Sequence, residues 1–396
     1  MTKSTKQQGL LLFILGIIFL SLTLRSPLTA VGPVTEFIQN GLSMSTTLVG
    51  LLTTIPLLAF AVVSPFAPKV AKQIGTEATL LWSIVLLIAG IALRSGGSVT
   101  LLIFGTAIIG VAISFGNVLL PSVIKDRFPL HVGLLTAVFS VVMNLSAALG
   151  AGIAYPVAAD TSFGWQGALG VWALLGIIAV VVWLPQLKHR KSEPVDAAAE
   201  VVENPSILKS SVTWAVTLMM ALQSLIFYTT AAWLPAMLIE KGMNPDSAGY
   251  MLSFMQFAQL PMTFIAPILA SKMANQRPLV WFFSVLYIVG FTGLLLDPNG
   301  TLTILWMILI GFAGGTSFAL TMMMFSLRTK TAMDAAELSG VAQSIGYLLA
   351  AAGPVLFAFV NETTGSWYVP TILFIVTCVL LLVVALHAAG NRFVRE

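Results

Sequence analysis

Charged residues are scarce in this sequence. Aspartate, glutamate, lysine and arginine make up 9% of its 396 residues, against roughly 25% in soluble domains. So little charge excludes an ordinary water-soluble globular protein. Hydrophobic residues account for 58% of the chain and the mean hydropathy is +0.98. The chain is therefore expected to lie in a lipid bilayer.

Cysteine is almost absent. Cys378 is the single one, which excludes a disulfide within the chain and a cysteine-rich metal site. A membrane enzyme would be expected to have a nucleotide-binding loop or a mid-membrane cluster of His, Asp or Cys, and the sequence has neither. A sizeable extramembrane module, typical of a receptor, is missing too. We therefore expect no enzyme, no cofactor and no metal.

Long apolar runs dominate what is there. A membrane helix needs about 20 apolar residues, and the sequence meets this requirement twelve times. The first run has no cleavage site of small residues and its helix is expected to continue past Arg25, so we interpret it as a retained span. The predicted spans are 9–31, 46–66, 78–93, 99–123, 132–157, 166–184, 212–237, 247–270, 279–296, 302–326, 337–360 and 367–389.

Positive charge is distributed unevenly between the predicted loops. If both termini are cytoplasmic, all but three of the 19 lysines and arginines fall on the cytoplasmic side. Arg94 and Lys241 are then in outer loops, and Arg25 is inside the first span. This bias predicts the orientation in a bacterial-type cytoplasmic membrane. It also accounts for the basic pI without a nucleic-acid partner.

The two halves of the chain resemble each other at a spacing of roughly 200 residues. "GPVTEFIQNGLSMS" (32–45) matches "LPAMLIEKGMNPDS" (234–247), and "SPFAPKVAK" (64–72) matches "FIAPILASK" (264–272). Six spans in each half give a parallel repeat, with its axis along the membrane normal. We predict two pseudo-symmetric six-helix bundles, 1–184 and 211–396, joined by a cytoplasmic linker, 185–210. Such repeats are typical of carriers with a midplane substrate site, exposed alternately to each side by rocking of the halves.

Arg25 is the one fixed charge predicted at mid-depth, because all 15 acidic residues fall in loops or at span ends. A guanidinium stays protonated, and intramembrane charges usually mark functional sites. We therefore expect Arg25 to anchor an anionic or electron-rich substrate. The alternatives are hydration in a cavity, a bond to a neighbouring carbonyl, or a position of Arg25 at another depth. With no mid-membrane carboxylate, uniport, exchange or co-transport of a proton with the substrate is favoured over coupling through a carboxylate.

Polar and aromatic residues on other spans complete the expected site. Amides offer donors and acceptors without charge, which suits a small solute that must also leave. Each amide has an alternative role in an interhelical hydrogen bond worth about 0.6 kcal/mol, and Trp233 has one as an interfacial belt residue or gate. The candidates are Asn117, Asn144, Gln223, Phe227, Tyr228, Trp233, Gln256, Gln259, Gln343 and Tyr347.

Opposite charges meet at two predicted cytoplasmic span ends, "KDRF" (125–128) and "RTKTAMDAAE" (328–337). We expect gating ion pairs there, with Lys125, Asp126, Arg127 and Arg328 as candidates. Anchoring at the membrane surface explains the cations equally well.

Four motifs, "LTLRSPLTAVGP", "GNVLLPSVIKDRF", "LQSLIFYTTAAWLP" and "SGVAQSIGYLLAAAGP", give the chain a resemblance to the cyanate and nitroimidazole transporter family of the major facilitator superfamily. The resemblance implies a monomeric twelve-helix carrier of the major facilitator fold for compact solutes such as cyanate or 2-nitroimidazole. It places Arg25, Asn117, Gln223, Tyr228, Trp233, Gln343 and Tyr347 in helices that line the cavity. The loop "FAPKVAKQIGTEA" lacks the aspartate usual in the superfamily, so a cytoplasmic lock must use other groups.

A multidrug efflux carrier of the same superfamily is the alternative function. The 16 methionines and abundant aromatic residues of the chain favour this hypothesis. The lack of an acidic membrane residue for cationic drugs counts against it. A membrane enzyme or receptor is a remote alternative.

Overall fold

The computed structural model describes residues 3–44, 46–189, 206–297 and 300–395. Within those residues, twelve helical segments are long and apolar enough to cross a membrane, from Leu11–Val34 to Tyr368–Ala388. The expectation of an all-α protein with twelve spans is therefore confirmed. Most of the predicted linker, 190–205, lies outside the described residues.

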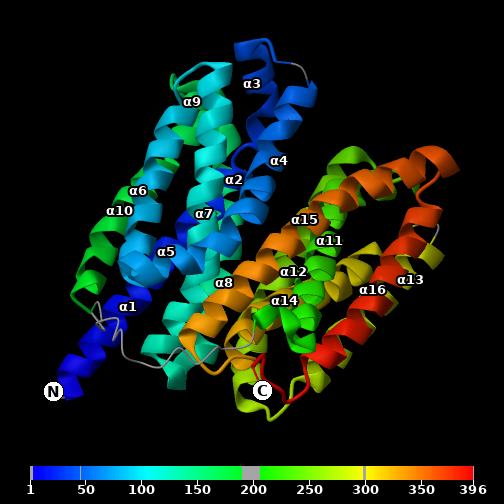
Figure 1. Cartoon of the computed structure of the whole chain (residues 1–396). Coiled ribbons are helices and arrows are strands. Elements are labelled where there is room, and N and C mark those ends of the chain that lie inside the picture. The colour runs from blue at the N-terminus through cyan, green and yellow to red at the C-terminus, as the bar shows by residue number, and fades with distance from the viewer. Residues whose placement is uncertain (1–2, 45, 190–205, 298–299, 396) are drawn as a thin grey trace. The chain divides into compact units, whose positions relative to one another are not determined.

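The chain divides into two compact units (Figure 1). The first comprises residues 1–127 and 138–204, and the second 128–137 and 205–396. The division moves residues 128–137, at the start of the fifth span, into the second unit.

The first half of the chain forms ten α-helices and four short 3₁₀ turns within its described residues. These helices are α1 (Lys3–Thr23), α2 (Ser26–Thr29), α3 (Thr35–Leu42), α4 (Thr46–Val63), α5 (Ala67–Ile74), α6 (Thr76–Arg94), α7 (Val99–Arg127), α8 (Val132–Asp160), α9 (Gly164–Gly170) and α10 (Trp172–Trp183). The turns are η1 (Gly32–Val34), η2 (Ser64–Phe66), η3 (Pro129–His131) and η4 (Leu184–His189).

The second half is more regular, with one long helix for each predicted span. Its elements are η5 (Ile207–Lys209), α11 (Ser211–Glu240), α12 (Pro245–Lys272), α13 (Arg277–Leu296), α14 (Thr303–Leu327), α15 (Ala332–Thr364) and α16 (Tyr368–Ala388). In Figure 1, α11 (green) and α15 (orange) run side by side, and the two helices pack closely along their length.

Close helix approaches at glycines recur in both units. A Cβ on Gly90 would lie 3.0 Å from the backbone nitrogen of Ile109, and one on Gly290 would lie 3.4 Å from that of Ile310. Two further pairs follow the same rule. Gly110 packs on Pro56 and Ala59 as Gly311 packs on Met255 and Ala258, and Gly150 packs on Thr29 as Gly353 packs on Thr229. Small residues allow such contacts between membrane helices, and their repetition supports the predicted pseudo-symmetry.

Large apolar side chains are exposed on many spans, as lipid contact requires. Trp82 and Phe104 are each 64% exposed, and Val355 is 71% exposed. Small polar residues such as Ser140, Thr217 and Thr316 are instead completely buried. This distribution is the one expected for helices whose outer faces meet hydrocarbon.

Candidate functional site

The first membrane span is broken at Arg25. Helix α1 ends at Thr23, and α2 begins at Ser26 with Arg25 as its N-cap residue, at φ −124° and ψ −39°. The expectation that the helix continues past Arg25 is wrong. Pro27 explains the break, because it has no backbone N–H to donate to the carbonyl of Thr23 and its ring would clash with that carbonyl in a continuous helix.

The hydroxyl of Ser146, in α8, occupies the gap in the helical ladder. The backbone N–H of Ser26 would donate to the carbonyl of Leu22 in an unbroken helix. It donates instead to Ser146 Oγ at 2.9 Å, and that hydroxyl donates to the Leu22 carbonyl at 2.5 Å. The Ser26 hydroxyl adds a bond to the same carbonyl at 2.8 Å. A side chain inserted into the ladder is a recognised cause of a sharp kink.

Helix α8 comes close to the break because Gly150 has no side chain. A Cβ at this position would lie 2.3 Å from Thr29 Oγ1 and 2.7 Å from the Ser26 carbonyl oxygen. The Thr29 hydroxyl also donates to the carbonyl of Ala147 at 2.9 Å. The break is therefore fixed by α8 on one side.

Arg94 holds the break from another side. It was expected in an outer loop, but its side chain is completely buried at the end of α6. Its Nη1 donates to the Pro27 carbonyl at 2.6 Å, and its Nη2 donates to the Leu169 carbonyl at 3.4 Å. A position at the end of an apolar run could not distinguish a loop cation from a buried one, so sequence reasoning missed this residue.

Three of the predicted site residues belong to segments that meet at the break. Arg25 itself is partly exposed. Asn117 in α7 is 5% exposed, and its neighbour Gly116 packs against Leu24, whose Cδ2 lies 2.5 Å from where a Cβ would be. Asn144 in α8 is partly exposed and lies two residues before Ser146.

Aromatic candidates form a cluster within the second unit. The rings of Tyr228 in α11 and Tyr347 in α15 have their centres 6.4 Å apart, and those of Phe227 and Tyr228 are 5.2 Å apart. Both pairs are edge-to-face, a favourable geometry for aromatic rings. Tyr347 is buried, whereas Phe227 and Tyr228 are partly exposed.

The candidate glutamines differ in their surroundings. Gln223 Nε2 donates to Ser224 Oγ at 2.7 Å, and Gln343 Nε2 donates to Ser339 Oγ at 2.8 Å, each within its own helix. Gln259 is buried beside Gly314. Gln256 is exposed, so the two glutamines of α12 do not share the environment that their spacing suggested.

Trp233 bridges two helices at the end of the aromatic cluster. Its Nε1 donates to the carbonyl of Pro354 at 2.8 Å, and its ring centre lies 5.3 Å from that of Trp367. The bond ties α11 to α15.

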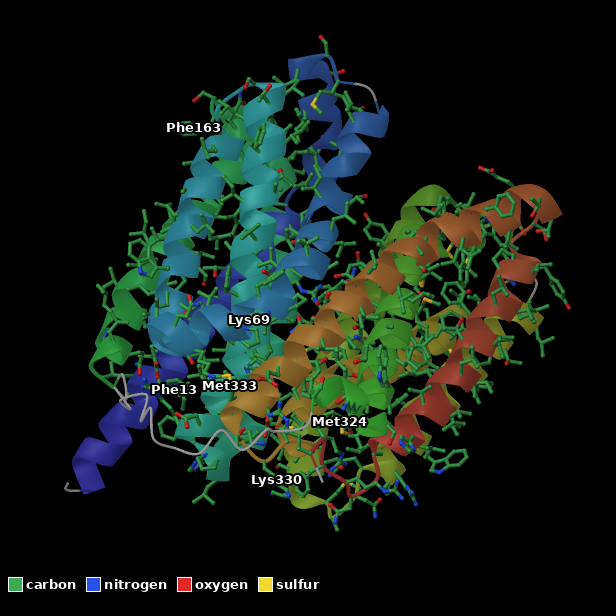
Figure 2. The ribbon with its side chains drawn as sticks, viewed as in Figure 1. Phe13, Lys69, Phe163, Met324, Lys330 and Met333 are labelled. Carbon is green, nitrogen blue, oxygen red and sulfur yellow. The ribbon has the colours of Figure 1, made fainter. Side chains whose placement is uncertain are left out.

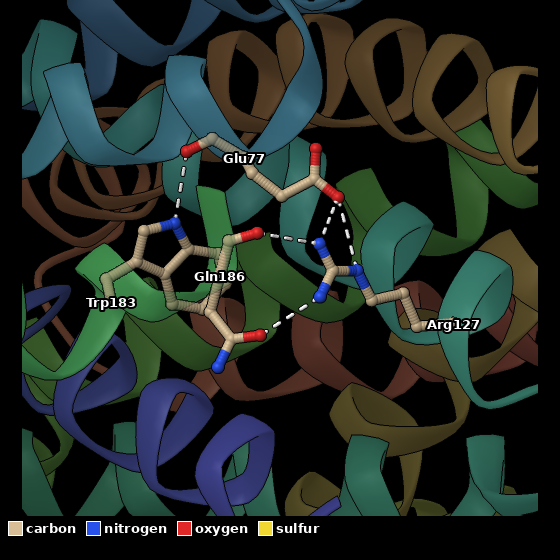
Figure 3. A network of polar contacts seen from close by, with 4 residues as sticks. All are labelled: Glu77, Arg127, Trp183 and Gln186. Carbon is tan, nitrogen blue, oxygen red and sulfur yellow. Dashed lines mark hydrogen bonds and ion pairs between the residues drawn. The ribbon is translucent and has the colours of Figure 1, made fainter. Parts of the chain in front are cut away.

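Arg127, a predicted gating residue, is bound inside the first unit. Its Nη2 lies 2.5 Å from Glu77 Oε1, and its Nη1 donates to the side-chain oxygen of Gln186 at 2.9 Å (Figure 3). Trp183 completes the network with a bond from Nε1 to the Glu77 carbonyl at 3.0 Å. These contacts join the ends of α6, α7 and α10. The neighbouring candidates Lys125 and Asp126 are partly exposed and exposed.

Arg328 makes the corresponding contacts in the second unit. Its side chain donates to Gln276 Oε1 and to the carbonyls of Ala388, at 2.7 Å, and Ala389, at 3.1 Å. Burial lowers the pKa of this guanidinium to about 10. Glu77 lies at the start of α6 and Gln276 precedes α13, so one unit supports its arginine with a carboxylate and the other with an amide.

The C-terminal segment is tied to the same end of the second unit. Arg395 forms ion pairs with Asp334 and with Glu337, and the N–H of Val394 donates to the Arg328 carbonyl at 2.9 Å. Lys330, labelled in Figure 2, follows α14, and its ammonium lies 5.6 Å from the centre of the Phe393 ring. The described contacts of both predicted gating arginines therefore lie within single units.

Comparison with known proteins identifies the family of the chain. The model of the Major Facilitator Superfamily matches residues 11–354. The chain is 41% identical to the uncharacterized transporter YycB of Bacillus subtilis, over 96% of this chain and 94% of that protein. It is 37% identical to the 2-nitroimidazole transporter of Escherichia coli over the full length of both. The cyanate transport protein CynX of Escherichia coli is 25% identical, over 96% and 98%.

Among solved structures, the proton:xylose symporter XylE bound to 6-bromo-6-deoxy-D-glucose has the same fold. Its TM-score is 0.81, with 98% of each chain covered and 12% sequence identity. At that identity the likeness concerns the fold alone.

Proposed function

The chain belongs to the major facilitator superfamily, and we propose that it carries a small anion or a compact polar or nitro solute, of the cyanate or 2-nitroimidazole kind, across the membrane. Its resemblance to the cyanate and nitroimidazole transporter family is confirmed by relatives that cover nearly its whole length. The chain is thus a membrane transporter and not an enzyme.

Arg25 is the proposed substrate anchor, and its position at the break of the first span is the observation that carries the proposal. A break places backbone groups and a guanidinium where a continuous helix would present only its outer surface. The side chain is partly exposed and the residue lies inside the candidate span Leu11–Val34. Broken helices near mid-membrane form ion and substrate sites in other carriers.

Within the second unit, we propose neutral groups as further substrate contacts. The hydroxyls of Tyr228 and Tyr347 and the amides of Gln223 and Gln343 belong to the closely packed helices α11 and α15. The edge of an aromatic ring and an amide N–H both present partial positive charge to an electron-rich solute. Neutral donors bind such a solute without holding it too tightly to leave.

The wider mechanism is the rocker-switch form of alternating access, with a monomer in the cytoplasmic membrane and both termini on the cytoplasmic side. The concentration of lysine and arginine on that side supports the orientation. The arginine networks around Arg127 and Arg328 support movement of each unit as one body, because each network joins three span ends.

The test is uptake of labelled cyanate and 2-nitroimidazole by proteoliposomes that contain the purified full-length protein. We expect uptake of at least one solute, lowered by about tenfold or more in Arg25→Ala and poorly restored in Arg25→Lys, because a guanidinium offers paired donors that an ammonium lacks. Arg277→Ala and Arg277→Lys are matched controls, since Arg277 is exposed.

Two results would contradict the proposal. Uptake of neither solute by the wild-type protein rejects the substrate class, and normal uptake by both Arg25 variants rejects the anchor. Drug resistance on overexpression, abolished by an uncoupler, would instead favour a multidrug efflux carrier.

A further inference from the structure

We propose that Arg94 is a specificity-determining residue, whose buried charge beside the break of the first span makes the site select anions over neutral solutes of similar size. The inference rests on the proposed carrier function and narrows its substrate class. Arg94 is not proposed to touch the substrate. It acts through the electrostatic field that its charge produces at the break.

The geometry brings the charge of Arg94 to the segment that carries Arg25. Its Nη1 donates to the carbonyl of Pro27, two residues after Arg25, so the Cα atoms of residues 25 and 27 are at most about 7 Å apart. That carbonyl needs a donor, because the N–H of Val31 bonds to Leu28 instead. The bond therefore both closes the break and fixes a guanidinium beside it.

The charge of Arg94 has no carboxylate partner among the described residues. The ion pairs of the described chain join Arg127 to Glu77 and Arg395 to Asp334 and Glu337. Arg94 has two carbonyl partners, and its Nε makes no hydrogen bond within the described structure. Its side chain is also fully buried. A buried charge that carbonyl dipoles offset only in part projects a positive potential onto its surroundings, and solvent screens it weakly.

Neither arginine has a counterpart in the second unit. The second unit reproduces the glycine contacts around these positions, at Gly290 beside Ile310 and at Gly353 beside Thr229. In that alignment Arg25 corresponds to Leu225 and Arg94 to Leu294. Helix α11 is also unbroken from Ser211 to Glu240. The glycine contacts are thus made in the second unit with leucines at both positions, and the two cations distinguish the first unit from the second.

The charge of Arg94, fixed beside the segment that carries Arg25, explains the selection physically. An anion at this segment is attracted to the charge, whereas a neutral solute of similar size is not. Removal of the Arg94 charge therefore weakens binding of anions and leaves neutral solutes largely unaffected. If Arg94 had a purely structural role, its substitution would weaken binding of anions and of neutral solutes equally.

The first test compares Arg94→Gln, which keeps a donor without the charge, with Arg94→Lys, which keeps the charge. In proteoliposomes we expect Arg94→Gln to raise the KM for cyanate about tenfold while the KM for neutral 2-nitroimidazole changes less than about twofold. Arg94→Lys should restore the preference. Arg277→Gln removes an exposed charge and should leave the ratio unchanged. Equal KM changes for both solutes in Arg94→Gln would overturn the inference.

A second test does not depend on the substrate. Arg25→Cys in a Cys378→Ser background is treated with a negatively and a positively charged methanethiosulfonate reagent. We expect the anionic reagent to react faster, with the ratio of rates lowered about tenfold by Arg94→Gln. An unchanged ratio of reaction rates overturns the inference. This result is distinct from a failure of the wild-type protein to carry cyanate or 2-nitroimidazole, which would reject the proposed function instead.

A matched position covers the case in which Arg94→Gln fails to fold. Leu225→Cys in the same background lies at the corresponding place in the second unit, where residue 294 is leucine. The ratio of anionic to cationic reaction rates should be higher for Arg25→Cys than for Leu225→Cys. Equal ratios at the two positions would contradict a field from Arg94.

Discussion

The backbone N–H of Ser26 donates to the hydroxyl of Ser146 at 2.9 Å, across a gap in the first membrane helix that no main-chain carbonyl fills. The same hydroxyl donates to Leu22 at 2.5 Å. One serine from a distant helix therefore bonds to the two backbone groups, Ser26 N–H and Leu22 C=O, that would pair with each other in an unbroken helix. Since buried backbone groups are almost always paired, the break depends on this side chain.

Ser146→Ala should destabilise the protein by about 1–3 kcal/mol, because it leaves a buried N–H without a partner and removes one donor from the Leu22 carbonyl. Thermal unfolding of the purified protein measures the change. Ser140→Ala is the matched control, since Ser140 is buried in the same helix and its hydroxyl has no hydrogen bond within the described structure. An equal loss in both variants would show that the bridge contributes nothing particular.

Gly150→Ala should cost about 1–3 kcal/mol and reduce uptake, because the new methyl group would lie 2.3 Å from Thr29 Oγ1 and 2.7 Å from the backbone of Ser26. The two helices must then separate at the break. Gly152→Ala provides the comparison, as no atom lies within 4 Å of the added carbon. It should be neutral or slightly stabilising, and a similar loss there would point to helix flexibility instead of contact.

Glu77→Ala should destabilise the first unit by about 3 kcal/mol, because it leaves the poorly exposed guanidinium of Arg127 without its carboxylate. Glu77→Gln should cost clearly less. The second unit already supports Arg328 with Gln276 and backbone carbonyls, so an amide suffices in this geometry. Chemical or thermal unfolding of the two variants distinguishes the effects, and equal losses would mean that the charge of Glu77 is indispensable.

Acid should weaken the contacts that Asp297 makes at the start of α14. Burial acts to raise its pKa, but bonds from the N–H groups of Leu302, Thr301 and Trp306, and the charge of Lys241, bring the pKa below the usual 3.8. A carboxyl with a lowered folded-state pKa stabilises fully above 3.8, and the stabilisation is lost as the pH falls through the folded-state value. The difference in melting temperature between wild type and Asp297→Asn should therefore shrink in acid. A difference independent of pH would contradict this assignment.

Local patterns were sufficient to predict the spans, and the repeat was predicted from evidence of the same kind. Each span is an apolar run, and the repeated "AP" and glycine positions recur along the chain in the same order, so composition and spacing carry that information. The break at Arg25 also had a local signal. Pro27 cannot donate the backbone bond that a continuous helix needs, but the apolar run around it favoured a continuous span.

The contacts that build the site could not be predicted in the same way. The bridge from Ser146 to Ser26 joins residues 120 positions apart, and no spacing within either segment indicates it. Arg94 closed a span beside a glycine-rich turn, where a loop cation and a buried one look alike in sequence. Only the packing of α6 against the break distinguishes them. The predicted roles of the gating residues and of the individual site residues stay predictions.

The unbroken helix α11 has an evolutionary consequence. If the halves descend from a duplicated six-span ancestor, the glycine contacts that both retain date from before the duplication, whereas the two arginines and the proline distinguish one copy from the other. Substrate selectivity would then have arisen by substitutions in the first half only, while the second half kept the original helix. Replacing residues 22–30 with the sequence of residues 222–230 would restore the form of the first span that has leucine in place of Arg25, within the full-length transporter.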